Sequence, residues 1–279
     1  MIIDFHTHLF PKSMRDNREK YFEGEPAFKM LYAWEKAKLI GGLEMVQVMD
    51  EEQVDVSVAF GFPWKNPEYS KIHNDYIMDV VARYPERIKG LCCLDTCHES
   101  AADEVIRCIK GGLSGVGELA FYETGIVCEA RDSLAPIMTI CREKDLPVMI
   151  HTNEPVGHMY PGKSENTLAQ IYDIIKRFPD NKIVLAHWGG GVFFYALLKK
   201  EVKEALKNVW LDTAASPFLY DPAIYRHAMD IIGVEKILFG TDFPLIRPSR
   251  YFKEFEAAEL TQEEKNAISG NNARELIAI

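Results

Sequence analysis

Two histidines near the start of the chain give the first chemical signal. The sequence Met-Ile-Ile-Asp-Phe-His-Thr-His places His6 and His8 two positions apart in an apolar run, with Asp4 in step with them. Side chains two apart lie on the same face of a β-strand, so the two imidazoles would point the same way. Buried ring nitrogens need partners, and a divalent metal is the partner that converging imidazoles share. The spacing predicts a metal site at the end of a strand.

Four more polar residues interrupt apolar runs farther along the chain. Glu118 follows Gly-Val-Gly, His151 follows Val-Met-Ile, His187 follows Val-Leu-Ala, and Asp242 follows Phe-Gly-Thr. Each stands where a short buried strand is expected to end. In a barrel of parallel strands, the carboxyl ends meet at the rim that carries the active site. We therefore expect the six residues to lie together at one rim: His6, His8, Glu118, His151, His187 and Asp242.

Eight short apolar runs are expected to form the strands that carry these residues. They are Ile2–His8, Val54–Phe62, Ile88–Asp95, Ser114–Phe121, Pro147–His151, Lys182–His187, Val209–Thr213 and Lys236–Thr241. Helical spacing predicts helices at His73–Tyr84, Ala101–Lys110, Arg131–Glu143, Ser164–Arg177, Val192–Lys207, Pro222–Ile232 and Glu263–Ala278. Nearly continuous apolar runs are typical of parallel strands covered on both faces.

The alternation of strands and helices predicts an α/β fold, a (β/α)8 TIM barrel. A doubly wound open sheet is the alternative, but it needs a glycine-rich turn after its first strand, where this chain has His-Thr-His-Leu-Phe-Pro. Residues 11–42, rich in charged and aromatic side chains, break the alternation. We expect them to form a partly helical lid over the rim, with a helix at Ala27–Lys38. No second domain is expected within residues 1–279.

Composition and charge exclude several classes of protein. The 279 residues include 32 Lys and Arg against 42 Asp and Glu, a formal charge of −10, which disfavours a large nucleic-acid surface. The longest uncharged stretch, between Lys182 and Lys199, is too short for a membrane span, and the N-terminus lacks the features of a signal peptide. Six cysteines without a CxxC pair indicate reduced thiols. We predict a cytoplasmic protein that binds neither nucleic acid nor membrane.

Several motifs resemble those of the amidohydrolase superfamily. They are Asp4-Phe-His6-Thr-His8, Asn74-Asp75-Tyr76 and Arg83-Tyr84-Pro85-Glu86-Arg87, the histidines His151 and His187, Phe239-Gly240-Thr241-Asp242-Phe243-Pro244, and Asn272-Ala273-Arg274. They are most similar to the amidohydrolase-related (amidohydrolase 2) branch, which includes aminocarboxymuconate-semialdehyde decarboxylase. The resemblance spans nearly the whole chain and implies a metal-dependent barrel.

The resemblance implies that His6, His8, His151 and Asp242 hold one ion, commonly zinc, with His187 beside it as a general acid or base. Glu118 departs from the decarboxylase pattern and is more similar to TatD-like hydrolases, in which the carboxylate often bridges two ions. In that arrangement, Glu118 and His151 would join His187 at a second ion. The number of ions, one or two, stays open.

These residues suit a metal-dependent hydrolase. A bound divalent ion lowers the pKa of its water to about 7, so that hydroxide could attack a C–N or C–O bond, with Asp242 shuttling the proton and His187 polarising the carbonyl. The alternative is a non-hydrolytic decarboxylase of an unsaturated or aromatic acid, but Glu118 weighs weakly toward hydrolysis. A catalytically inactive barrel is disfavoured, because it would have no reason to keep such a costly polar cluster.

Four further residues are candidates for contact with a small, carboxylated substrate. Arg247 follows the eighth strand and could pair with a carboxylate, although an ordinary surface ion pair is as good an interpretation. His158 lies in the loop after the fifth strand. Trp64 and Tyr122 follow the second and fourth strands and would suit a cyclic or conjugated acid, or they would simply pack beneath the lid. The resemblance also implies that the protein could form a homodimer.

Overall fold

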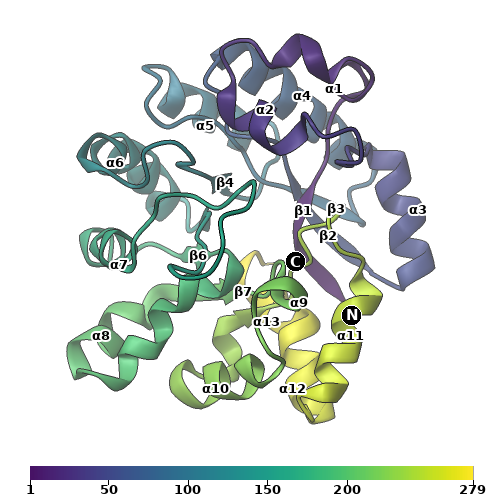
Figure 1. Cartoon of the computed structure of the whole chain (residues 1–279). Helices are drawn as coiled ribbons and strands as arrows, with labels where there is room; N and C mark the ends of the chain where they lie inside the picture. Colours follow the sequence, from purple (N-terminus) through teal and green to yellow (C-terminus); the bar gives the residue numbers. More distant parts are fainter. Residues whose placement is uncertain (279) are drawn as a thin grey trace.

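Eight parallel strands close into a barrel in the computed structural model, which describes residues 1–278. They are β1 (Ile3–His8), β2 (Val56–Phe60), β3 (Ile88–Gly90), β4 (Val116–Leu119), β5 (Val148–Ile150), β6 (Ile183–Leu185), β7 (Val209–Asp212) and β8 (Ile237–Leu238). Two sheets, in the orders β1-β2-β3 and β4-β5-β6-β7-β8, form the wall. Bridges from Cys92 to Val116 and from Thr7 to Phe243 join them at both seams. The (β/α)8 fold is therefore confirmed (Figure 1).

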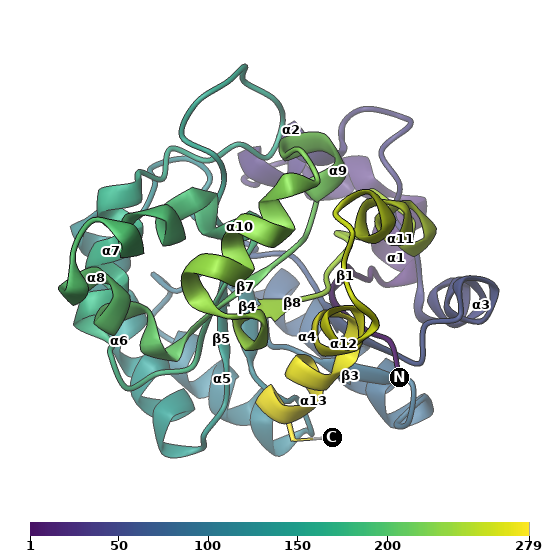
Figure 2. The same ribbon diagram turned by 90° about the horizontal axis from the view of Figure 1, so that it is seen from below.

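Apolar side chains cover both faces of the strands. Met149 and Val184 pack in one buried cluster with Phe5, whereas their neighbours along β5 and β6 pack in a second, larger cluster with the surrounding helices. This double burial explains the nearly continuous apolar runs in the sequence. Helix α13 (Asn272–Leu276) contributes to the first cluster. Figure 2 shows α13 and both chain termini at one end of the barrel, with α2 and α9 at the other.

Helices surround the barrel. They are α3 (Gly42–Glu52), α4 (Pro67–Arg83), α5 (Ala101–Lys110), α6 (Cys128–Glu143), α7 (Leu168–Arg177), α8 (Lys200–Ala205), α9 (Ser216–Leu219), α10 (Ala223–Ile232), α11 (Pro248–Ala257) and α12 (Gln262–Asn266). The sequence did not predict α3, α9 or α11. The helix expected at Val192–Lys207 was wrong, because the segment divides into a 3-10 stretch, η2 (His187–Leu197), and the short α8. The last expected helix is interrupted by a π turn, η5 (Ala267–Asn271).

Residues 11–42 form a partly helical insertion, as expected. It contains α1 (Lys12–Asp16), a 3-10 turn (Arg18–Tyr21) and α2 (Pro26–Tyr32). The helix is shorter than the predicted Ala27–Lys38, since α2 ends at Tyr32 and Trp34 is exposed. An aromatic cluster attaches the insertion to the barrel: Phe10 and Phe28 pack against Phe62 and Trp64, which follow β2. The insertion therefore sits above the strand ends.

Five cysteines are free thiols, and the side chain of the sixth, Cys128, lies outside the described residues. Among residues 1–278, no helix has the length and apolar character needed to cross a bilayer. The cytoplasmic location and the single-domain organisation stay predictions.

A buried histidine on α4 anchors the insertion. The His73 Nε2–H group donates to the Leu9 carbonyl oxygen at 2.5 Å, and the Trp64 Nε1–H group donates to His73 Nδ1 at 2.9 Å. Burial lowers the pKa of His73 to about 4, and the Leu9 hydrogen bond only partly offsets that effect. The ring is therefore neutral in the folded protein and has a structural role.

We predict that protonation of His73 in the unfolded chain destabilises the fold at mildly acidic pH. Its unfolded pKa is about 6.5 and its folded pKa about 4, so the unfolded state binds more protons as pH falls between these values. From about pH 7.5 to about pH 5, this linkage removes about 2 kcal/mol from the free energy of unfolding. In His73→Gln, urea titrations should show a correspondingly smaller loss. His98→Gln, at an exposed histidine, should keep the full loss; equal pH slopes in all three proteins would refute the assignment.

Candidate metal centre

The strand ends bring all six predicted ligands into one cluster. β1 supplies His6 and His8, β4 supplies Glu118, and His151, His187 and Asp242 follow β5, β6 and β8. Glu118 lies at the centre: Oε1 is 2.9 Å from His151 Nδ1 and 3.6 Å from His187 Nε2, and Oε2 is 3.7 Å from His6 Nε2. Asp242 Oδ1 lies 3.2 Å from His8 Nε2 and 3.7 Å from His6 Nε2.

Each of the four histidines uses one ring nitrogen to bond an acceptor elsewhere in the protein. The pairs are His6 Nδ1 with Asp212 Oδ2 at 2.8 Å, His8 Nδ1 with the Gly61 carbonyl oxygen at 3.4 Å, His151 Nε2 with the Gly162 carbonyl oxygen at 3.0 Å, and His187 Nδ1 with the Ala214 carbonyl oxygen at 3.0 Å. Carboxylate and carbonyl oxygens only accept, so each of these nitrogens carries a hydrogen. In neutral rings, the other nitrogens carry lone pairs, and these face Glu118 and Asp242.

Lone pairs that face carboxylates require a proton or a metal ion between them. His6 Nε2 is buried and has no hydrogen-bond partner, although it points at two acids. Three groups of ligand atoms each lie within 4.8 Å of one another: His6, His8 and Glu118; His6, His187 and Asp242; and Glu118, His151 and His187. Imidazole and carboxylate are the ligands that zinc and manganese take in proteins. The residues present therefore fit a divalent metal.

The pKa values of the clustered histidines and acids show how strongly these groups interact with one another. Burial disfavours the charged form of His6, but Asp212, Glu118 and Asp242 outweigh it and raise its pKa to about 10. Burial would raise the pKa of Glu118, but His151 and His6 hold it well below its ordinary value. Burial would also raise the pKa of Asp242, but the neighbouring histidines, chiefly His8, lower it. Burial would lower the pKa of His187, but Glu118 and Asp242, chiefly Glu118, raise it. A cation would take the place of the protons that these shifts favour.

Asp212, at the end of β7, is a functional residue that the sequence analysis missed. It is fully buried and bonds His6 Nδ1, and its Oδ1 accepts from the backbone N–H groups of His187 at 2.8 Å and Ala214 at 3.0 Å. A carboxylate behind a metal-binding histidine fixes the tautomer and orientation of the ring. The run Val-Trp-Leu-Asp, an acid at the end of a buried strand, could have revealed it.

Asp4 positions Asp242 rather than joining the ligands. The register of β1 against β2 shifts between Asp4 and Thr7, so the simple alternation that placed Asp4 beside the histidines fails there. Its Oδ1 accepts from the Thr241 N–H at 3.0 Å and its Oδ2 from the Thr241 hydroxyl at 2.5 Å. The Asp242 N–H donates to the His6 carbonyl oxygen at 2.9 Å. These bonds hold the loop after β8 against β1; burial raises the pKa of Asp4 to about 7.

A glycine-rich turn carries the chain away from His187. His187 and Trp188 have φ angles of 54° and 60°, and the following Gly189, Gly190 and Gly191 also lie in the left-handed region. A Cβ on Gly190 would lie 2.4 Å from the Asn153 carbonyl oxygen, so only glycine fits there. The turn thus changes the direction of the chain sharply, and the Asp212 carboxylate accepts from the N–H group of His187.

Of the four expected substrate-contact residues, only Tyr122 is brought to the cluster, with its ring 5.0 Å from the His151 ring. Arg247 is bonded to Glu51 and to Glu52 at the end of α3, which is the surface ion pair that the sequence offered as the alternative. Trp64 is fully buried beneath the lid and bonds His73. His158 is exposed in the loop after β5, 6.0 Å from the Tyr160 ring.

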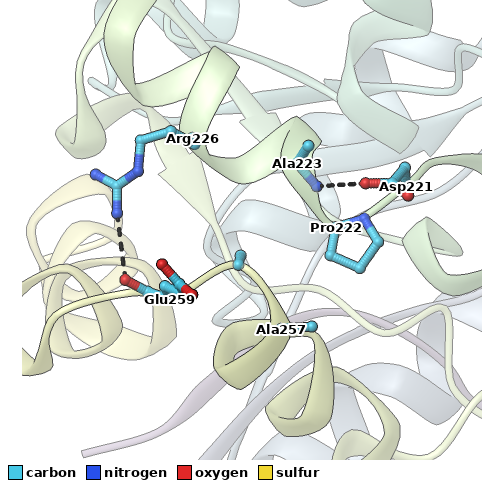
Figure 3. Close-up of a pocket in the computed structure, with 7 residues that line it drawn as sticks. Asp221, Pro222, Ala223, Arg226, Ala257 and Glu259 are labelled. Atoms are coloured by element: carbon cyan, nitrogen blue, oxygen red, sulfur yellow. Dashed lines mark hydrogen bonds between the residues drawn. The ribbon is translucent and has the colours of Figure 1, made fainter.

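Two cavities lie outside the ligand cluster. One of about 380 Å³ lies between the start of α10 and the end of α11, where Arg226 donates to the Glu259 carbonyl oxygen (Figure 3). It contains none of the six ligands. The other, of about 340 Å³, lies between the insertion, at Glu25 and Ala27, and the loops after β3 and β4. Tyr122 lines this second cavity as well as contacting His151.

We predict that Asp212→Asn weakens metal binding although no ligand is removed. The amide keeps the shape of the side chain but loses the charge that orients His6, and loss of such a supporting carboxylate costs about 10- to 100-fold in metal affinity. Competition with a chromogenic chelator would measure it. Asp230→Asn, at an exposed acid on α10, serves as the matched control. Unchanged affinity in Asp212→Asn would contradict the assigned role.

Comparison with known proteins places the chain in a family. 2-Amino-3-carboxymuconate-6-semialdehyde decarboxylase from Dictyostelium discoideum is 26% identical over 99% of this chain and 91% of that protein. Gamma-resorcylate decarboxylase from Polaromonas sp. is 22% identical over 84% of this chain and 86% of that protein.

Solved structures share the fold. 5-Carboxyvanillate decarboxylase LigW from Sphingomonas paucimobilis superposes with a TM-score of 0.78 at 19% identity, over 100% of this chain and 99% of that chain. Dihydroxybenzoic acid decarboxylase from Polaromonas sp. JS666, with bound manganese and the inhibitor 2-nitroresorcinol, superposes with a TM-score of 0.75 at 19% identity, over 99% and 96%. The sequence model of the amidohydrolase family matches residues 3–279, and the chain therefore belongs to the amidohydrolase family.

Proposed function

We propose that the protein is a metal-dependent decarboxylase that removes a carboxylate as CO2 from a small unsaturated or aromatic acid. The observation that carries the metal site is the buried, unpartnered His6 Nε2, which faces Glu118 and Asp242. Glu118 on its own favours hydrolysis. The relatives that align over most of the chain are named decarboxylases, and they support the alternative instead.

The ligand set suits manganese or zinc. It combines imidazole nitrogens with carboxylate oxygens and includes no thiolate within the three ligand groups of the described chain. Zinc was the sequence expectation, whereas the related dihydroxybenzoic acid decarboxylase binds manganese. The three overlapping groups would hold one ion or a close pair, and metal analysis of protein purified without chelators would count them. The homodimer stays a prediction.

The chain's own residues would supply and guide a proton. When bound, the ion would hold the substrate carboxylate and draw electron density from the carbons beside it. His187 is the proposed proton donor, because Ala214 fixes its Nδ1 and its Nε2 faces the cluster. Asp242, the most exposed acid of the cluster at 18%, is the proposed relay between solvent and His187.

The bond changes balance without any co-reactant. The proton from His187 forms a C–H bond at the carbon that bears the carboxylate. The C–C bond to the carboxylate then breaks, its electron pair restores the conjugated system, and CO2 leaves. Solvent returns a proton to His187 through Asp242. One proton is consumed for each CO2 released, and no water oxygen enters the product.

We predict that the metal-loaded protein releases CO2 from at least one acid of a panel comprising 2,6-dihydroxybenzoate, 5-carboxyvanillate and 2-amino-3-carboxymuconate-6-semialdehyde. In D2O, the product should carry one deuterium at the former carboxylate carbon. In ¹⁸O-labelled water, the product should gain no ¹⁸O. Removal of the metal should abolish the reaction, and addition of Mn²⁺ or Zn²⁺ should restore it. Product containing ¹⁸O, without release of CO2, would instead indicate hydrolysis.

We predict that His187→Gln lowers kcat by about 100-fold or more, because general acid catalysis contributes about 100- to 10,000-fold. Metal content, measured by mass spectrometry, should stay near the wild-type value, because the proposed ligands His6, His8, His151 and Asp242 remain. His227→Gln, at an exposed histidine on α10, should retain full activity. A His187→Gln variant that is active, or that is inactive only because it has lost its metal, would rule out the role of proton donor.

A further inference from the structure

His73, fully buried on α4, contacts the two backbone segments that hold the metal ligand His8. Its Nε2–H group donates at 2.5 Å to the carbonyl oxygen of Leu9, the residue after His8. Its ring packs closely against Gly61, where a Cβ would lie 2.8 Å from His73 Cγ and Nδ1. The Gly61 carbonyl oxygen is the partner of His8 Nδ1, at 3.4 Å. One buried ring therefore supports both pieces of backbone on which the position of His8 depends.

The partners of His73 determine which of its ring nitrogens carries the hydrogen. The indole N–H group of Trp64 can only donate, and it donates to His73 Nδ1 at 2.9 Å. The Leu9 carbonyl oxygen can only accept, so the hydrogen is on Nε2. Any other protonation form of the ring would break one of these two bonds. Trp64 thus fixes the tautomer that Leu9 requires.

The insertion in turn holds Trp64. The fully buried indole packs against Phe28 of α2, with the ring centroids 4.4 Å apart. The carboxylate of Glu25, just before α2, accepts from the two backbone N–H groups that follow Trp64, at 3.0 and 2.7 Å. A continuous set of contacts therefore runs from the insertion through Trp64 and His73 to His8.

His8 depends on this support more than the other histidines of the cluster do. Its bond to Gly61 is the longest of the four bonds that orient these rings, at 3.4 Å against 2.8 Å for His6 with Asp212. Its side chain is 13% exposed, whereas that of His6 is fully buried. A long bond to a neutral carbonyl orients a ring only weakly, so the position of the backbone decides where His8 Nε2 points.

We propose that His73 is a positioning residue that couples attachment of the insertion to the orientation of His8 at the metal. Such a coupling is reciprocal: bound metal should hold the insertion more firmly, and loss of the His73 bonds should weaken metal binding by the same factor. The inference rests on the proposed function, because it concerns the same metal centre. Metal affinity and amide exchange report it without turnover.

Two measurements on the full chain test the coupling: Mn²⁺ affinity, by competition with a chelator, and hydrogen exchange of the backbone amides of the insertion with and without Mn²⁺. In the wild type, Mn²⁺ should slow this exchange by about 10-fold. His73→Phe fills the space but removes both bonds, so it should lower the Mn²⁺ affinity by about 10-fold and abolish most of the slowing. Trp64→Phe, which removes only the N–H group, should have the same two effects to a smaller extent.

His73→Gln is the conservative variant, because its amide can donate to Leu9 and accept from Trp64, and it should retain both properties. Asn181→Ala is the matched control for general loss of stability. It removes a buried hydrogen bond to the Met138 carbonyl oxygen just before β6, at the barrel end opposite the ligands. It should keep the wild-type Mn²⁺ affinity and the wild-type slowing of exchange.

Wild-type Mn²⁺ affinity in His73→Phe and Trp64→Phe would overturn the inference, and Trp64→Phe decides alone if His73→Phe does not fold. A His73→Gln variant as impaired as His73→Phe, or exchange of the wild-type insertion that Mn²⁺ leaves unchanged, would overturn it as well. Release of CO2 without the coupling would leave the proposed function standing. Coupling without release of CO2 would refute the proposed decarboxylation and leave the role of His73 standing.

Discussion

The structure depends on four histidines whose free ring nitrogens point at the carboxylates of Glu118 and Asp242. His6 shows the constraint most clearly: Asp212 holds its Nδ1, and its buried Nε2 has no protein partner. Such an arrangement is costly in a buried site without a shared cation. The metal therefore completes the structure as well as the chemistry, and its binding would contribute to folding stability.

The rest of the architecture holds these lone pairs in place. Asp212 bonds both the His6 ring and the backbone at His187, so one carboxylate links β1, β6 and β7. Asp4 joins β1 to the loop that bears Asp242. Above them, His73 and Trp64 fasten the insertion, and its aromatic cluster reaches His151 through Phe62 and Tyr122. Metal centre and lid thus share one continuous set of contacts.

The sequence predicted what depends on local pattern. All eight strands and all six residues of the cluster could be found, because a polar residue at the end of an apolar run is visible in the sequence. Asp212 was missed, although it too is a polar residue at the end of an apolar strand. The position of Arg247 depends on a contact between distant segments, because Glu51 and Glu52 on α3 pair with the arginine. That contact has no signature in residue spacing.

Anomalous diffraction from crystals of the manganese-loaded protein would test the central claim most directly. The account predicts a peak within about 2.0–2.5 Å of His6 Nε2 and of a carboxylate oxygen of Glu118 or Asp242, with the Asp212 contact to His6 Nδ1 intact. A fully loaded crystal with no peak in this cluster, or with its peak elsewhere while His6 Nε2 bonds water, would contradict it.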